Sequence, residues 1–235
     1  RLKGIALLPL QSVEESVKEL RRAVKELGFV AAFMRSNPVV HRLLHDTDYD
    51  PLYQEALDLG VPIVISEATG SVLPELGTDR YPDDKFSHEA VSDTFELWVA
   101  MMSFFGHNVL ERFPGLKIVS AELNCGWLSY FLDRLDRVSA RGARLNRSPF
   151  PTKLTMKPSD YFKRQCYLVI DPDEDPAKYA LDWIGDDNFV FSTDYPHPDG
   201  KYPFSTDAFL KLPLSDEAKR KVLWDNCARL YGVPA

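Results

Sequence analysis

The stretch Asn188-Phe-Val-Phe-Ser-Thr-Asp-Tyr-Pro-His-Pro-Asp-Gly200 joins an expected strand to a group of reactive side chains. Its run Phe189-Val-Phe191 has the apolar, β-prone composition of a strand buried on both faces. Asp194 and His197 follow directly, and Pro196 stops the strand pairing there. In a barrel of parallel strands, polar groups at a strand's carboxyl end usually serve chemistry. The alternative interpretation is that Asp194 begins a turn and His197 is a solvated loop residue.

Five further apolar runs precede this strand and have the same character. They cover residues 3–10, 29–34, 61–65, 116–121 and 166–170. The segments between them carry helix signals, such as the capping box of Ser12 and Glu15 and the stop at Gly28. Alternation of this kind predicts an α/β fold in which a parallel sheet is covered by helices. A closed TIM (β/α)8 barrel needs eight strands. We therefore expect an incomplete TIM-type barrel of six βα units, with its first strands absent.

Size, charge and cysteine content exclude several classes of protein. The chain has 235 residues, of which 45% are hydrophobic and 27% charged, which suits one globular domain. A net charge of -7 argues against a nucleic-acid surface, and no apolar run approaches the ~20 residues of a membrane span. The three cysteines are far apart and form no CxxC pair, which favours a reduced, cytoplasmic setting.

The candidate functional residues are polar side chains that follow the expected strands. They are Arg35, Ser66, Glu67, Glu122, Asn124, Asp171, Asp194 and His197, together with His88 at the start of the next helix. Carboxylates and imidazoles that converge at one end of a barrel can bind a divalent metal and activate a bound water. Other readings stay open for single residues. Glu67 and Glu122 can cap the helices that follow or pair with an arginine, and His88 can be a cap or a surface residue.

Several of these segments also resemble a known family. The similarity lies in Val61-Pro-Ile-Val-Ile-Ser-Glu-Ala-Thr-Gly70, Glu111-Arg-Phe-Pro-Gly-Leu-Lys117, Leu116-Lys-Ile-Val-Ser-Ala-Glu-Leu-Asn-Cys-Gly-Trp127, Phe191-Ser-Thr-Asp-Tyr-Pro-His197 and Asn226-Cys-Ala-Arg-Leu-Tyr-Gly232. Together they resemble the amidohydrolase-related branch of the amidohydrolase superfamily, which includes the aminocarboxymuconate-semialdehyde decarboxylase-like enzymes. On this resemblance, residues 1–235 form one metal-dependent-hydrolase-like barrel domain that lacks its N-terminal strands.

The resemblance implies an enzyme that catalyses metal-assisted hydrolysis or non-oxidative decarboxylation of a small, carboxylated, often aromatic compound. It implies a divalent metal, zinc first and manganese or iron as alternatives, and a homodimer. Asp194 matches the family's aspartate after the last strand, which binds metal or acts as a base. Glu122 would be a metal ligand or general acid/base, and His88 and His197 would move protons or orient the substrate. The expected substrate-binding residues are Ser66, Glu67, Asn124 and Arg134, with Arg134 pairing with a substrate carboxylate.

Two departures from the family pattern bear on the metal. The His-x-His of the first strand has no counterpart here, and Ser66 stands where the third-strand metal-binding histidine is expected. A neutral hydroxyl is a poorer zinc ligand than imidazole. These departures keep two alternatives open, a metal-free, catalytically degenerate barrel that acts as a binding or scaffold protein, and a metal-free enzyme that uses Glu122, Asp194 and His88.

Overall fold

The computed structural model describes residues 2–66, 76–81, 83–122, 124–144, 154–197 and 200–233. Its six strands form one sheet in the order in which they occur in the chain, and every neighbouring pair is parallel. They are β1 Ile5–Leu7, β2 Ala31–Arg35, β3 Ile63–Ser66, β4 Ile118–Ser120, β5 Cys166–Ile170 and β6 Phe189–Phe191. The predicted α/β class is confirmed, and sequential parallel order is the arrangement of a (β/α)8 barrel wall. No pairing between the edge strands β1 and β6 occurs among the described residues.

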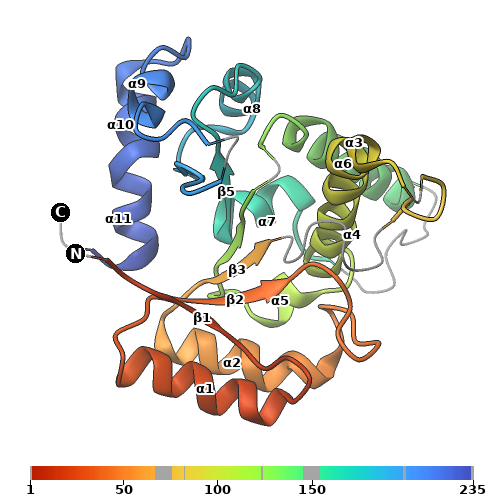
Figure 1. The fold of residues 1–235 in the computed structure, drawn as a ribbon. Coiled ribbons are helices and arrows are strands. Elements are labelled where there is room, and N and C mark those ends of the chain that lie inside the picture. Colours follow the sequence, from red (N-terminus) through yellow and green to blue (C-terminus); the bar gives the residue numbers. More distant parts are fainter. Residues whose placement is uncertain are drawn as a thin grey trace.

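Helices occur between the strands and after the last of them. They are α1 Val13–Lys25, α2 Asp50–Leu59, α3 Lys85–Ser87, α4 Asp93–Phe105, α5 Val109–Arg112, α6 Leu128–Arg144, α7 Pro158–Gln165, α8 Ala177–Ile184, α9 Ser205–Phe209, α10 Asp216–Arg220 and α11 Asn226–Tyr231. Figure 1 shows α1 and α2 side by side next to β1, β2 and β3, with α10 and α11 in line at the opposite end of the chain. No helix in the described ranges is long and apolar enough to cross a membrane.

Most predicted helices are confirmed, with two differences. The Ser12 side chain accepts a hydrogen bond from the Glu15 amide, which confirms the cap of α1. The helix expected to begin at His88 is divided, because a π-helical turn His88–Ser92 precedes α4, and residues 106–108 separate α4 from α5. Asn108, the N-cap residue of α5, adopts a left-handed φ of 73°. The short helix α9 was not predicted, since its five residues are too few to show a period.

The core has two parts that lie on opposite faces of the sheet. The larger part packs α1, α2, α4 and α6 against strand residues such as Ile63 and Ile118. The smaller part, called the inner-face cluster here, consists of Ala31, Val64, Val119, Tyr167, Val169, Val190 and Leu230. Because successive strand side chains alternate between faces, these two clusters tell which strand residues point inward.

Candidate active site

Three polar residues at the carboxyl ends of strands lie on the inner face. Ala31 belongs to the inner-face cluster and Met34 to the larger core, so alternation along β2 places Arg35 inward. The same count from Val64 in β3 places Ser66 inward. Counted from Val169, Asp171 follows β5 on that face as well. The expected convergence of strand-end groups is therefore present in the fold.

Ser66 and Glu122 form the first contact between these groups. Ser66 is buried at the end of β3, and its hydroxyl donates a hydrogen bond to a carboxylate oxygen of Glu122, which follows β4. The residue that replaces the expected histidine is thus engaged with the neighbouring candidate acid. Glu122 adopts a left-handed φ of 63°, a conformation that is uncommon for a residue with a side chain.

The loop that follows Glu122 is fastened to the loop after β5. The Asn124 amide donates a hydrogen bond to the carboxylate of Asp171. Glu174 is buried, and its Oε1 accepts hydrogen bonds from the backbone N–H groups of Cys125 at 2.6 Å and Gly126 at 2.7 Å. Burial raises the pKa of the Glu174 carboxyl, against the lowering effect of these hydrogen bonds. Glu174 therefore fixes the backbone that carries Glu122 and Asn124.

Asp194 and His197 form a second group after β6. Asp194 Oδ1 lies 3.6 Å from His197 Nδ1, and the His197 amide donates to the Asp194 carbonyl at 2.8 Å. Ser192 Oγ accepts a hydrogen bond from the Asp194 amide at 3.0 Å, and Asp194 adopts a left-handed φ of 53°. The Asp194 side chain is 24% exposed and that of His197 is 62% exposed. At 3.6 Å the two groups form no direct hydrogen bond, but a carboxylate and an imidazole so placed can relay a proton through one bridging water.

Backbone strain is concentrated at this edge of the sheet. Six non-glycine residues in the described ranges have a positive φ, and three of them are Glu122, Asn124 and Asp194. Such conformations cost on the order of 1–3 kcal/mol each and persist where the surroundings hold them, commonly at functional sites. Energetically costly backbone conformations therefore occur at residues that the sequence predicted to be functional.

Gly200 closes the turn around Asp194, and a methyl group there should disturb the site. A Cβ at Gly200 would lie 2.9 Å from the Thr193 carbonyl oxygen and 3.0 Å from that of Asp194. Both contacts are with backbone, so the turn must shift. We expect Gly200→Ala to lower kcat/KM by about 10-fold or more, since small misplacements of catalytic groups are costly. Steady-state kinetics and the melting temperature measure the two effects.

The matched control for this variant is Gly28→Ala. Gly28 also has a positive φ, at 71°, but a Cβ there would meet nothing within 4 Å. It should lose about 1 kcal/mol of stability and keep its activity. Equal activity losses in both variants would mean that Gly200 acts only through stability.

The remaining predicted site residues are not joined to this group by any described contact. His88 is buried, and its Nε2 lies 2.7 Å from the carbonyl oxygen of Tyr81. That places it in the segment before α4 as a bonded, internal residue. Arg134 lies on an exposed part of α6, nearly two turns from the helix start, and its predicted pairing with a substrate carboxylate stays a prediction. Glu67 lies outside the described residues.

Glu174 is a site residue that sequence reasoning missed. It follows β5 by four positions in Asp171-Pro-Asp-Glu-Asp175, where it looks like one solvated carboxylate among three others. The acidic run gave no sign that one member turns inward. Only the fold shows that Glu174 reaches the loop after β4.

The described residues do not by themselves make a complete metal site. Glu122 and Asp194 are the available carboxylates, but no group of three or more His, Cys, Asp or Glu side chains in the described ranges could hold an ion. Three or four protein ligands are usual for zinc. The predicted set of Asp194 and Glu122 is therefore a partial set of ligands.

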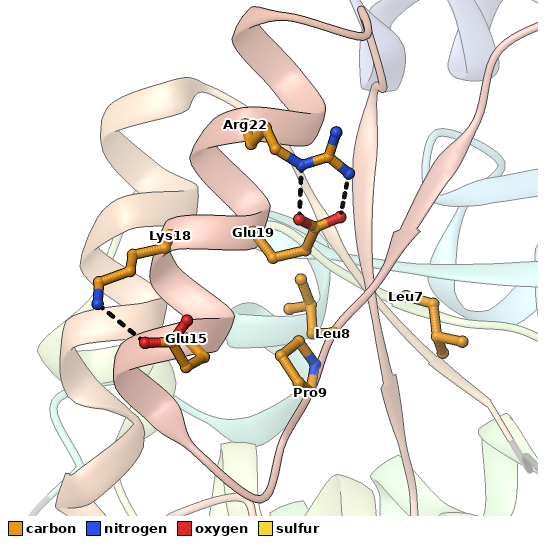
Figure 2. Close-up of a pocket in the computed structure, with 7 residues that line it drawn as sticks. All are labelled: Leu7, Leu8, Pro9, Glu15, Lys18, Glu19 and Arg22. Atoms are coloured by element: carbon orange, nitrogen blue, oxygen red, sulfur yellow. Dashed lines mark hydrogen bonds and ion pairs between the residues drawn. The ribbon is translucent and has the colours of Figure 1, made fainter.

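A hollow elsewhere on the surface is a poor candidate for the site. It measures about 590 Å³ and is lined by residues 7–9, at the end of β1, and by residues of α1. Figure 2 shows that its charged groups pair within α1, Lys18 with Glu15 and Arg22 with Glu19. These charges are compensated already, so we place the site at the strand ends.

The comparisons with known proteins agree with this fold. A family model described as "Amidohydrolase" matches residues 1–233. The gamma-resorcylate decarboxylase of Polaromonas sp. is 28% identical over 244 residues, which cover 98% of this chain and 70% of that protein. The 2-amino-3-carboxymuconate-6-semialdehyde decarboxylase of Dictyostelium discoideum is 26% identical, with 99% of this chain and 62% of that protein covered. This chain thus spans about two thirds of the length of these relatives.

A solved structure shows the same architecture with ligands bound. It is a dihydroxybenzoic acid decarboxylase from Polaromonas sp. JS666 with manganese and the inhibitor 2-nitroresorcinol. It superimposes with a TM-score of 0.82 and 26% identity over 99% of this chain and 70% of that one. The family, barrel fold and decarboxylase relatives predicted from the sequence are confirmed.

Proposed function

Because the chain belongs to the amidohydrolase family, we propose that it catalyses metal-assisted, non-oxidative decarboxylation of a small, carboxylated aromatic compound. The observation that carries this proposal is the convergence of two acid-bearing groups at one edge of the sheet. One is Glu122 with Ser66, and the other is Asp194 with His197. The relatives favour decarboxylation over hydrolysis, since both named above are decarboxylases.

The reaction needs a proton donor beside the ring carbon. The bond between that carbon and the carboxylate breaks, the electron pair stays on the ring, and CO2 leaves uncharged. A proton then forms the new C–H bond, so that each turnover consumes one proton. We assign this proton to the pair of Asp194 and His197, which lie 3.6 Å apart, with the more exposed His197 passing protons in from solvent. Glu122, held by Ser66, orients the substrate from the other side.

A divalent metal forms part of this proposal. The Polaromonas decarboxylase structure contains manganese, and Glu122 and Asp194 are the described residues that could contribute ligands here. Such an ion would polarise substrate oxygens as a Lewis acid. Zinc as the resident metal, a homodimer and a cytoplasmic location remain predictions.

A second candidate is a binding protein without catalysis. Ser66 in place of a metal-binding histidine, and the lack of a three-ligand group among the described residues, favour it. Both candidates use the same small-molecule site, so turnover and metal content separate them.

We expect purified full-length protein to carry on the order of one divalent ion per chain and to release CO2 from γ-resorcylate or a related hydroxybenzoate. Metal analysis by mass spectrometry and loss of substrate absorbance measure these two results. Removal of the ion by a chelator should abolish turnover, and adding manganese or zinc should restore it. Metal-free protein that shows no turnover after addition of either ion would support the binding protein instead.

A further inference from the structure

The end of β2 carries a cation and an amide whose hydrogen-bonding capacity is not used. Arg35 has one described hydrogen bond, from Nη2 to the Pro38 carbonyl oxygen at 3.1 Å, and its Nε is buried without a partner in the described part of the chain. Asn37 is only 3% exposed, and neither its Nδ2 nor its Oδ1 has a partner there. A buried polar group left unpaired costs about 1–3 kcal/mol. A polar occupant that pairs with these groups would recover that cost.

Within the described ranges, Arg35 lacks the acidic partner that Arg21 and Arg112 have. Arg21 is paired with Glu55 and Arg112 with Asp50, and Arg42 is held by the carbonyl oxygens of Leu10 and Gln11. No carboxylate lies within ion-pair distance of Arg35 among the described residues. Its guanidinium keeps donors for an anion, which it can bind through two parallel N–H groups.

The position of Arg35 places these donors beside the proposed catalytic groups. Arg35 and Ser66 are register partners on β2 and β3, and both point inward by the alternation described above. Neighbouring strands lie about 4.8 Å apart. Ser66 in turn contacts Glu122. A substrate held between Glu122 and Asp194 would therefore reach Arg35 with a substituent on its ring.

We propose that Arg35 and Asn37 form a subsite that binds an anionic substituent of the substrate other than the carboxylate that is lost. This inference rests on the proposed decarboxylation. The departing carboxylate gives up its negative charge as CO2 forms, so a guanidinium bound to it would stabilise the ground state more than the transition state. An anionic group that keeps its charge is bound equally in both states. The substrate class is thus an aromatic acid with a second acidic group, such as a dicarboxylate.

The subsite is tested by binding of isophthalate and benzoate, a dicarboxylate and a monocarboxylate of the same ring, measured by calorimetry on the full chain. We expect Arg35→Met to weaken isophthalate binding at least 10-fold and to change benzoate binding less than 3-fold. Asn37→Ala should weaken isophthalate in the same direction by a smaller factor. In turnover, Arg35→Met should raise KM with little change in kcat, the pattern of lost uniform binding.

The control is Arg22→Met, which removes the same charge from the exposed face of α1, where Arg22 pairs with Glu19. It should leave both affinities unchanged. Arg35→Gln serves as a second variant if the methionine variant fails to fold. Equal affinities of wild type and both Arg35 variants for isophthalate would overturn the subsite, as would a loss seen in Arg134→Met instead. The same holds if wild type does not bind isophthalate at millimolar concentration.

The outcomes keep the two proposals apart. Isophthalate binding that depends on Arg35 in a protein without decarboxylase activity would leave the anion subsite standing and remove the proposed function. Decarboxylase activity with no effect of Arg35 on either affinity would do the reverse.

Discussion

Asp194→Asn is expected to lower kcat by a factor of about 10²–10⁴, because asparagine can neither hold nor release the proton that the ring carbon must receive. The fold should tolerate the change. Asparagine keeps the volume and one acceptor oxygen of aspartate, and it accepts a left-handed conformation such as the φ of 53° found here. The melting temperature should therefore stay within a few degrees of wild type or rise.

Turnover of γ-resorcylate and thermal unfolding measure the two effects in the same preparation. The control is Asp182→Asn on α8, an exposed carboxylate that pairs with Lys178. It should leave kcat unchanged, since surface pairs of this kind contribute little. If Asp194→Asn instead lost much stability and kept its activity, Asp194 would be a structural residue and the proton donor would lie elsewhere.

Glu174→Leu is expected to destabilise the protein by about 2–4 kcal/mol, because it leaves the buried N–H groups of Cys125 and Gly126 without an acceptor. Activity should fall beyond what the loss of folded protein explains, since the same backbone carries Glu122. Glu174→Gln should restore most of both properties, because the amide oxygen can take the place of Oε1. If Glu174 only filled space, leucine would preserve stability and activity about as well as glutamine does.

The pH dependence of stability gives an independent reading of Glu174. Burial raises its pKa in the folded state, so the folded protein binds this proton more tightly than the unfolded chain. The stabilisation is present below the ordinary glutamate pKa of 4.5 and is lost as the pH rises through the higher folded-state value. Relative to Glu174→Gln, wild type should therefore lose stability as the pH rises from about 4.5. If the free energies of unfolding of wild type and Glu174→Gln changed equally with pH across this range, the assignment would be wrong.

Local sequence was sufficient for the elements and for most of the candidate list. Apolar runs such as Val61-Pro-Ile-Val-Ile65 and Phe189-Val-Phe191 identified the strands, because a strand buried on both faces needs continuous apolar residues. Strand ends then pointed to Ser66, Glu122 and Asp194, since parallel strands bring their carboxyl ends to one edge. Each of these signals lies within a few residues of chain.

The contacts that make a site between those residues came only from the tertiary structure. The pairing of Ser66 with Glu122 spans 56 residues, and the hold of Glu174 on Cys125 spans 49. The local sequence does not indicate which side chain of one loop will contact a neighbouring loop. Arg134 lies on an exposed part of α6, and its predicted pairing with a substrate carboxylate stays a prediction.

The sequence by itself determined the strands, their alternation with helices and the residues at the strand ends. Hydrophobic periodicity and turn chemistry act between residues that are close along the chain. Tertiary structure decided that Arg35 faces inward beside Ser66 and that Glu174 turns inward beneath the loop after β4. Those placements depend on strand register and on how one loop packs against another, and both are set only when distant parts of the chain come together.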